Sequence, residues 1–149
     1  MDGELSFSQN NSDLAQIKWH LEQCDQLFIP PLSERVLLSE YAAKLSDRGE
    51  RFEAWMNKTL VGLVAAYANN LQDRIAYVTS VSVLPEFQGA NIAGRLLTSC
   101  ARFAESRGFR RLALEVHGSN SQVIKLYHRM GFTTSREQGQ MLLMAKCLS

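Results

Sequence analysis

The chain of 149 residues has the length of one domain, and 46% hydrophobic with 21% charged residues is typical of a globular protein rather than a disordered one. Its 16 Lys and Arg residues nearly balance 15 Asp and Glu residues, which leaves a net charge of +1. This balance gives no electrostatic reason to expect nucleic acid binding, although a local positive site would still suffice for a small anionic ligand.

The sequence carries no signal for a membrane, a secretion pathway or a metal. No apolar run approaches the roughly 20 residues that cross a bilayer, and the acidic residues 1–4 do not resemble a signal peptide, so a cytoplasmic protein is expected. Cys24, Cys100 and Cys147 are scattered and predict neither a disulfide framework nor a metal site. Cys100 falls on the apolar side of a predicted helix, where packing is its expected role.

Two helices are predicted in the first third of the chain. Asn11 or Ser12 can cap the first, which runs to Cys24. Residues 28–31 interrupt it, because proline lacks a backbone donor and restricts the residue before it. A second amphipathic helix is expected over residues 33–45.

The middle of the chain predicts an antiparallel meander of three strands. Residues 52–56 alternate between two faces, residues 59–67 are almost continuously apolar, and residues 75–84 are rich in β-branched side chains. Residues 57–58 and 69–74 are expected to form the connecting loops.

Helical and strand patterns alternate in the last third. Helices are predicted over residues 92–104 and 121–130, with strands over residues 111–117 and 140–147. No repeat or linker interrupts the pattern, so residues 1–149 are interpreted as a single α/β domain with a mixed sheet. The last strand is expected at an edge of the sheet, where it could pair between subunits; monomer and homodimer therefore both stay open.

The turn from Gln88 to Gly94, rich in small residues, lies between a predicted strand and a predicted helix. The first N–H groups of a helix lack internal partners and carry the positive end of its dipole, so such a turn suits a pyrophosphate. The GxxxxG spacing of residues 89–94 also occurs in nucleotide P-loops, but Arg95-Leu96 stands where Lys-Ser/Thr is required. Close packing of the helix on the sheet is an alternative that needs no ligand.

A third interpretation comes from a resemblance to a known family. Gln88-x-x-Asn91-x-Ala93 resembles the Gln/Arg-x-x-Gly-x-Gly/Ala signature of the GNAT superfamily of N-acetyltransferases. The flanking blocks are also similar to those of the family, namely Val83-Leu84-Pro85, Leu114-Glu115-Val116, Asn120 and Leu126-Tyr127-x-x-x-Gly131-Phe132. The resemblance covers about residues 50–147. It departs at Asn91, where the family has glycine; asparagine tolerates left-handed backbone angles, but the affinity for the cofactor is brought into question.

The resemblance implies a fold and a mechanism. The fold is a GNAT-like α+β domain, with a mixed, mostly antiparallel sheet of about six strands, splayed central strands and flanking helices. The reaction is acetyl transfer from acetyl-CoA to an amine, without a metal. The implied cofactor-binding residues are Val81, Val83, Gln88, Gly89, Ala90, Asn91, Ile92, Ala93, Gly94, Asn120 and Tyr127.

Three residues have implied catalytic roles. The Val83 N–H would face the thioester carbonyl, and Tyr127 would protonate the departing thiolate. An ordinary core position is the alternative for Tyr127, and a helix cap is the alternative for Asn120. Glu115 is the candidate base for the amine, with Glu53, His117 or water-mediated deprotonation as alternatives.

The acceptor site of the family lies among the first two helices, their connecting loop and the meander. In this chain those regions contain the candidate acceptor-binding residues Phe28, Trp55, Tyr77 and Thr79. A small metabolite amine such as an amino sugar is favoured, because no acidic cluster predicts a polyamine. The alternatives are a non-catalytic acetyl-CoA-binding sensor or interaction module, and a protein N-terminal or lysine acetyltransferase.

Overall fold

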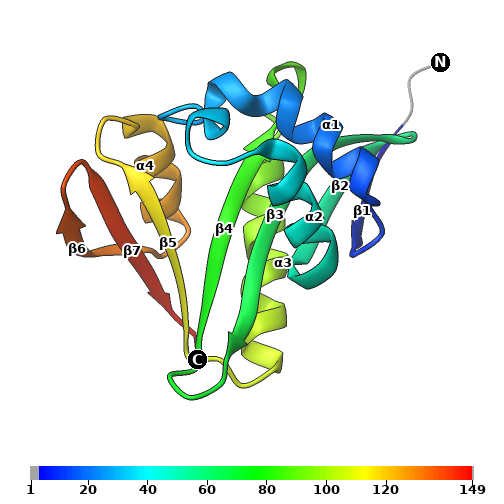
Figure 1. Cartoon of the computed structure of the whole chain (residues 1–149). Helices are drawn as coiled ribbons and strands as arrows, with labels where there is room; N and C mark the ends of the chain where they lie inside the picture. The colour runs from blue at the N-terminus through cyan, green and yellow to red at the C-terminus, as the bar shows by residue number, and fades with distance from the viewer. Residues whose placement is uncertain (1–3, 149) are drawn as a thin grey trace.

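The computed structural model describes residues 4–148, which form a mixed α+β fold around one twisted sheet (Figure 1). The strands are β1 (Leu5–Gln9), β2 (Glu50–Met56), β3 (Thr59–Asn70), β4 (Ile75–Val83), β5 (Arg111–His117), β6 (Thr133–Gln138) and β7 (Met141–Cys147). The α-helices are α1 (Leu14–Cys24), α2 (Leu38–Arg48), α3 (Ile92–Ser106) and α4 (Ser121–Arg129). Short 3-10 turns are η1 (Asp25–Leu27), η2 (Leu32–Glu34) and η3 (Pro85–Phe87). Residues 1–3, which entered the signal-peptide argument, and residue 149 lie outside this part.

The sheet has the strand order β1-β2-β3-β4-β5-β7-β6, and only the β4–β5 pair is parallel among the described residues. The expected mostly antiparallel sheet is therefore confirmed, with seven strands in place of about six. The unpredicted strands β1 and β6 lie at the two edges; β6 is exposed at every residue and so has no buried apolar face to signal it. The expectation that the strand ending at Cys147 is an edge is wrong, because β6 covers it.

The helix boundaries differ from those expected near the N-terminus. Asp13, rather than Asn11 or Ser12, caps α1: its carboxylate accepts a hydrogen bond from the Gln16 N–H at 2.8 Å. The second helix begins at Leu38, because residues 32–34 form a separate 3-10 turn. Among residues 4–148 no helix combines the length and the apolar character needed to cross a membrane.

The sheet is covered by helices on both faces (Figure 1). On one face α1 and α2 bury Ile17, Leu21 and Leu45 against β3, and on the other face α3 buries Leu96 in the larger core. Gly62 of β3 permits the close approach of α3, since a Cβ there would lie 2.6 Å from Ile92 Cγ2. The start of α3 is thereby fixed directly over the centre of the sheet.

A bulge in β4 lies beside the position at which β4 and β5 separate. Val78 pairs with Ala66 and Ser80 pairs with Ala65, which leaves Thr79 as the extra residue. The parallel pairing with β5 runs only from Ile75 to Val78 of β4 and stops there. The splayed central strands expected from the resemblance are therefore confirmed.

Glu53 is a buried structural carboxylate, contrary to the usual exposure of a strand glutamate. It is 0% exposed and accepts hydrogen bonds from the backbone N–H groups of Asn11 at 2.9 Å and Ser12 at 2.8 Å. The guanidinium of Arg51 lies 3.6 Å away and also donates to the Leu45 carbonyl at 3.0 Å. This network ties the start of α1 and the end of α2 to β2, and it removes Glu53 as a candidate base.

We expect Glu53→Gln to lower the free energy of unfolding by about 3 kcal/mol, because the amide replaces one of the two acceptor oxygens with a donor and removes the negative charge that compensates buried Arg51. Urea unfolding measures the change. Glu22→Gln, an exposed glutamate on α1, is the matched control and should change it by less than about 0.5 kcal/mol. A loss below about 1 kcal/mol for Glu53→Gln would contradict the structural role.

Candidate active site

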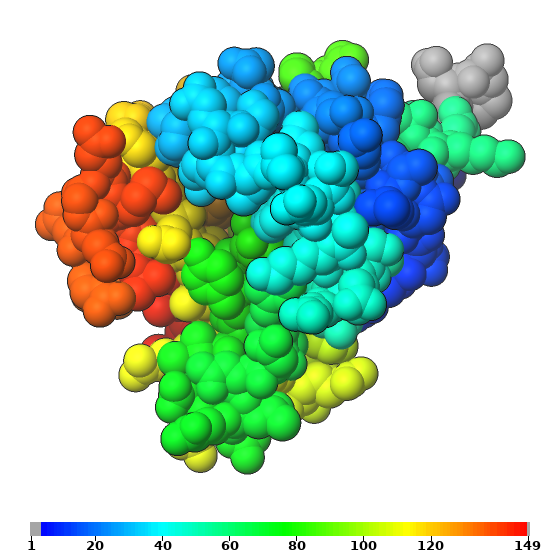
Figure 2. Space-filling view, viewed as in Figure 1, coloured from blue at the N-terminus to red at the C-terminus, as the bar shows by residue number. Residues whose placement is uncertain are grey.

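A cavity of about 770 Å³ lies where β4 and β5 separate. Its walls come from the splayed parts of these strands, the start of α3, the helix α4 and the segment around residue 28. Figure 2 shows the surface hollowed here, between the cyan segment that precedes α2 and the yellow and orange segments of the last third of the chain. The volume falls within the range of small-molecule and cofactor sites.

The edge of β4 that faces this cavity presents backbone groups. The Leu84 N–H donates to the Val61 carbonyl of β3 at 2.8 Å. Because successive peptide groups of a strand point to opposite sides, the N–H groups of Val83 and Val81 point away from β3. Pairing with β5 has already ended at Val78, so this edge of β4 borders the cavity, and both valines line it.

The turn before α3 has left-handed backbone geometry at Asn91, the position at which the family has glycine. Asn91 has φ of 56° and ψ of 31°, and the first helical hydrogen bond runs from the Arg95 N–H to its carbonyl at 3.1 Å. The N–H groups of residues 92–94 precede that bond and are oriented along the helix axis. A Cβ on Gly94 would clash with Asn91 Oδ1, so the Asn91 side chain lies against the first turn.

Helix α4 contributes Asn120 and Tyr127 to the cavity. Asn120 occupies the N-cap position, but its side chain makes no capping hydrogen bond. Tyr127 is 4% exposed, and its ring lies 5.8 Å from that of Phe132. Burial raises the pKa of the Tyr127 phenol above its ordinary value, because the charged form is poorly solvated there. Its hydroxyl therefore keeps its proton at neutral pH.

Tyr77 and Glu115 join β4 and β5 on the cavity wall, just where the strands separate. The Tyr77 hydroxyl donates to Glu115 Oε1 at 3.0 Å. Burial, together with the hydrogen bond to this carboxylate and its charge, raises the pKa of Tyr77. The direction of Glu115, undetermined by strand alternation alone, is thus toward the cavity.

The expected acceptor residues are not all brought together. Phe28, Tyr77 and Thr79 line the cavity, and Thr79 Oγ1 lies 2.6 Å from the Tyr41 hydroxyl. Trp55 does not line it: the side chain is 9% exposed on β2 and donates to Ser8 Oγ of β1 at 2.7 Å. Two strands separate Trp55 from β5, so it is removed from the acceptor set.

Most of the remaining predicted site residues also line the cavity. Val81, Val83, Gln88, Gly89, Asn91, Ile92, Ala93 and Gly94 line the cavity, whereas Ala90 is exposed and does not. His117 also lines it, and its Nδ1 lies 2.7 Å from Ser119 Oγ. Cys100 is buried, as expected for packing. Among residues 4–148 no group of three potential metal ligands occurs.

A buried histidine beneath the cavity, His20, was not predicted from the sequence. His20 of α1 is 0% exposed, with Nδ1 2.9 Å from the Leu60 carbonyl and Nε2 2.9 Å from Ser82 Oγ. Because a carbonyl only accepts, Nδ1 carries the proton and Nε2 accepts from the Ser82 hydroxyl. Desolvation lowers the pKa of His20 to about 4, so the ring is neutral. Its place within the apolar stripe of α1 was the signal that could have found it.

Comparison with known proteins agrees with this geometry. Residues 14–132 match the model of the Acetyltransferase (GNAT) family. The chain is 34% identical over 61 residues to mycothiol acetyltransferase of Amycolatopsis mediterranei, covering 41% of this chain and 20% of that protein. It is 32% identical over 90 residues to an uncharacterised N-acetyltransferase of Methanocaldococcus jannaschii, covering 58% and 40%. The chain thus spans less than half the length of either relative.

The fold also matches that of a solved structure. The PaiA N-acetyltransferase of Thermoplasma acidophilum, solved in complex with coenzyme A, superposes with a TM-score of 0.77 over 95% of this chain and 99% of that one, at 16% identity. The family match spans most of the chain, and the sheet, its splay and the helices agree with it. This chain belongs to the acetyltransferase (GNAT) family and carries an acyltransferase domain of that family.

We expect Asn91→Ala to lower the free energy of unfolding by about 1 kcal/mol, because alanine tolerates left-handed angles poorly. Asn91→Gly should stay within about 0.5 kcal/mol of the wild type and bind coenzyme A at least as tightly. Urea unfolding and titration calorimetry measure the two properties. Equal stability of the two variants would contradict a backbone role for Asn91.

His20 predicts a specific pH dependence. Its folded-state pKa of about 4 lies below the ordinary 6.5, so the unfolded chain binds the proton more readily and stability falls as the pH drops from 6.5 toward 4. Between pH 7 and pH 4 the wild type should lose about 3 kcal/mol more than His20→Gln. His128→Gln, on an exposed residue, is the control and should follow the wild type. Parallel curves for the wild type and His20→Gln would refute this prediction.

Proposed function

We propose that this chain transfers the acetyl group of acetyl-CoA directly to the primary amine of a small acceptor such as an amino sugar. The observation that carries the proposal is that one cavity joins the start of α3, the unpaired edge of β4 and the buried phenol of Tyr127. An anion site, an oxyanion donor and an acid are what direct transfer from a thioester requires.

The start of α3 supplies the proposed phosphate site. The N–H groups of residues 92–94 and the positive end of the helix dipole favour a pyrophosphate without a cluster of lysines. The pantetheine arm would follow the edge of β4 past Val81 and Val83, with Asn120 across the cavity. Because the Asn120 side chain makes no capping hydrogen bond, it supports a role toward the amides of that arm. The bound cosubstrate supplies a thioester, whose carbonyl carbon the amine attacks.

Val83 has the proposed oxyanion role. Its N–H lies on the side of β4 that β3 does not use, beside the cavity. A fixed donor there favours the negative charge that develops on the acetyl oxygen as the N–C bond forms. Its own carbonyl points to the same side and accepts a hydrogen bond from Gln88 Nε2 at 3.4 Å, which ties the turn to the strand.

Tyr127 and Glu115 have the proposed roles in proton transfer. As the C–S bond breaks, the thiolate takes the proton of Tyr127, which burial keeps protonated until that step. Glu115 is the proposed acceptor for the proton that the ammonium loses before attack. Its bond to Tyr77 orients the carboxylate at the point where the strands separate. Because Glu115 is exposed, delivery of this proton through water is equally compatible with its position.

A non-catalytic acetyl-CoA-binding module is the second candidate, and Asn91 is the observation that favours it. Its side chain lies at the start of α3, where the family has a glycine, and would crowd a phosphate. Tyr127 in the cavity favours catalysis, and the similarity to mycothiol acetyltransferase favours a small acceptor over a protein.

Release of free thiol in the presence of acetyl-CoA and a panel of amines tests the proposal. Turnover with at least one small amine is expected. Binding of acetyl-CoA without turnover for any amine would favour the non-catalytic module instead.

Tyr127→Phe should lower kcat by about 100-fold while the Kd for coenzyme A changes less than about twofold, because only the acid is removed. Thiol release gives kcat, and calorimetry gives the Kd. Tyr41→Phe, at a partly buried phenol that donates to the Thr79 carbonyl outside the proposed acid position, is the control for loss of a hydroxyl. Unchanged kcat in Tyr127→Phe would remove the acid role.

A further inference from the structure

We infer that the acceptor carries an anionic group, a carboxylate or a phosphate, in addition to its amine, and that Arg35, Lys44 and Arg48 bind that group. These three residues are called the basic row. The inference rests on the proposed function, because it names the class of acceptor that the same site would take.

A second cavity of about 460 Å³ adjoins the first. Its lining includes Lys44, Arg48 and Tyr67, and none of the described residues that line it is a carboxylate. Tyr77 belongs to both cavities, and Arg35 lines the larger one. If the amine of an acceptor lies near Tyr77 in the first cavity, the other end of the acceptor can therefore reach the basic row.

Lys44 and Arg48 make only weak contacts with the rest of the protein. Lys44 Nζ lies 5.0 Å from the centre of the Tyr67 ring. Arg48 Nε lies 3.5 Å from the Asp47 carboxylate, but both side chains are at least 70% exposed, so water screens this pair. Lys44 and Arg48 are one helical turn apart on α2 and share a face, which lets one anionic group approach both.

Charges of both signs line the site, and Lys125 and Arg129 of α4 border the first cavity together with Glu115. The carboxylate of Glu115 lies on β5, where Tyr77 holds it at 3.0 Å. The basic row lies opposite, on α2 and on the residue that follows η2. An acceptor with an ammonium at one end and an anion at the other matches this arrangement. A polyamine would place a second cation against the basic row.

Two buried hydroxyls lie in the wall between the cavities. Within residues 4–148 neither Tyr67 Oη nor Ser80 Oγ makes a hydrogen bond of normal geometry, although the hydroxyls of Thr79 and Tyr41, respectively, lie close enough to interact with them. A buried hydroxyl without a partner is destabilising, so a polar ligand or a water here would be favourable. Tyr67 lines the second cavity and Ser80 the first, which supports a polar rather than an apolar acceptor between them.

Matched acceptors test the inference. Glucosamine 6-phosphate differs from glucosamine by a phosphate, and lysine differs from cadaverine by a carboxylate. We expect kcat/KM, measured by thiol release, to be at least about tenfold higher for the anionic member of one or both pairs. The pair that shows the preference identifies phosphate or carboxylate as the recognised group. Spermidine should be a poorer acceptor than the preferred compound.

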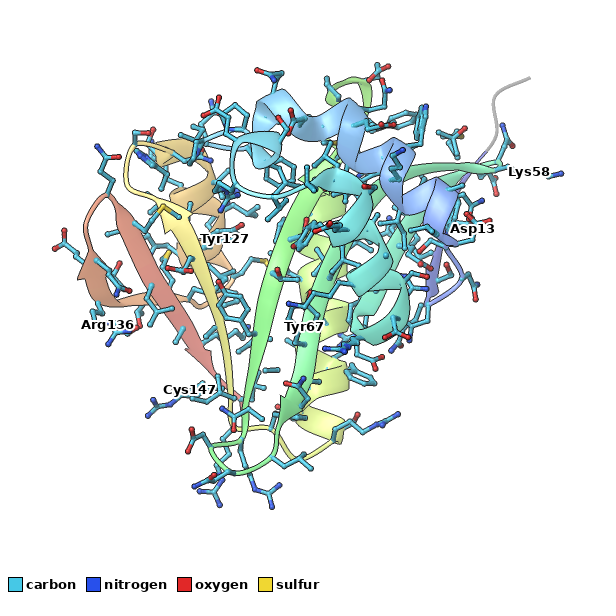
Figure 3. The ribbon with its side chains drawn as sticks, viewed as in Figure 1. Asp13, Lys58, Tyr67, Tyr127, Arg136 and Cys147 are labelled. Atoms are coloured by element: carbon cyan, nitrogen blue, oxygen red, sulfur yellow. The ribbon has the colours of Figure 1, made fainter. Side chains whose placement is uncertain are left out.

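Variants then assign the preference to the basic row. Lys44→Met with Arg48→Met, and separately Arg35→Gln, should bring the ratio of kcat/KM between pair members to within about threefold of one. The ratio should fall because kcat/KM for the anion-bearing member decreases more than kcat/KM for its partner. Lys58→Met with Arg136→Met removes the same charges at opposite ends of the molecule (Figure 3) and should keep the ratio.

Two results would overturn the inference. Equal kcat/KM for both members of each pair would overturn the inference and leave the proposed function intact. A preference for the anion-bearing member that all the variants retain would also overturn it. If no amine is acetylated, the proposed function fails. The inference about the basic row is then tested by calorimetric titration of the same pairs into the protein with coenzyme A. Tighter binding of the member that carries the phosphate or carboxylate than of the member without it supports the basic row, and equal binding contradicts it.

Discussion

The short parallel ladder between β4 and β5 is the constraint on which the rest of the site depends. It stops at the pair of Val78 and Leu114, and the bulge at Thr79 follows at once. Had the ladder continued, β5 would have occupied the backbone groups of Val81 and Val83. The separation leaves one edge of a central strand without a partner strand, which is unfavourable unless water or a ligand satisfies it. The cavity is therefore both a space and a set of oriented donors.

Contacts on both faces of the sheet hold the separated part of β4. On one face the neutral ring of His20 connects Ser82 to the Leu60 carbonyl, so α1 is bonded to two adjacent strands. On the other face α3 lies close over Gly62 of β3. These contacts hold the separated part of β4 in position although it has no hydrogen bonds to β5. They also fix the start of α3 relative to the strand edge, the two elements that would hold opposite ends of one extended ligand.

The distribution of charge explains how a nearly neutral chain can favour an anionic cosubstrate. The helix dipole at the start of α3 supplies partial positive charge without any lysine. Under the two proposals above, Glu115 on β5 and the basic row on the side of α2 serve the acceptor, and Lys125 and Arg129 of α4 also border the first cavity. The buried pair of Arg51 and Glu53 lies away from the cavity and has a structural role.

The sequence by itself determined the elements whose signals are local. The turn from Gln88 to Gly94, the strand and the helix on either side of it and the meander follow from spacing and turn chemistry, and asparagine at position 91 is compatible with the left-handed angles found there. Only the tertiary structure decided which polar side chains are buried, because their partners are distant in the chain. Ser12 and Glu53 are 41 residues apart, and His20 and Ser82 are 62 apart.

The same physical reason explains why the sequence did not predict the edge strands or the direction of the Trp55 side chain. β1 and β6 exist because β2 and β7 offer them hydrogen-bonding edges, and their own residues lack a buried apolar pattern. Trp55 faces Ser8 of β1, a strand that local pattern did not predict, so its direction could not be foreseen. Periodicity places a residue on an element; the pairing of elements far apart in the sequence decides which residues line the cavity.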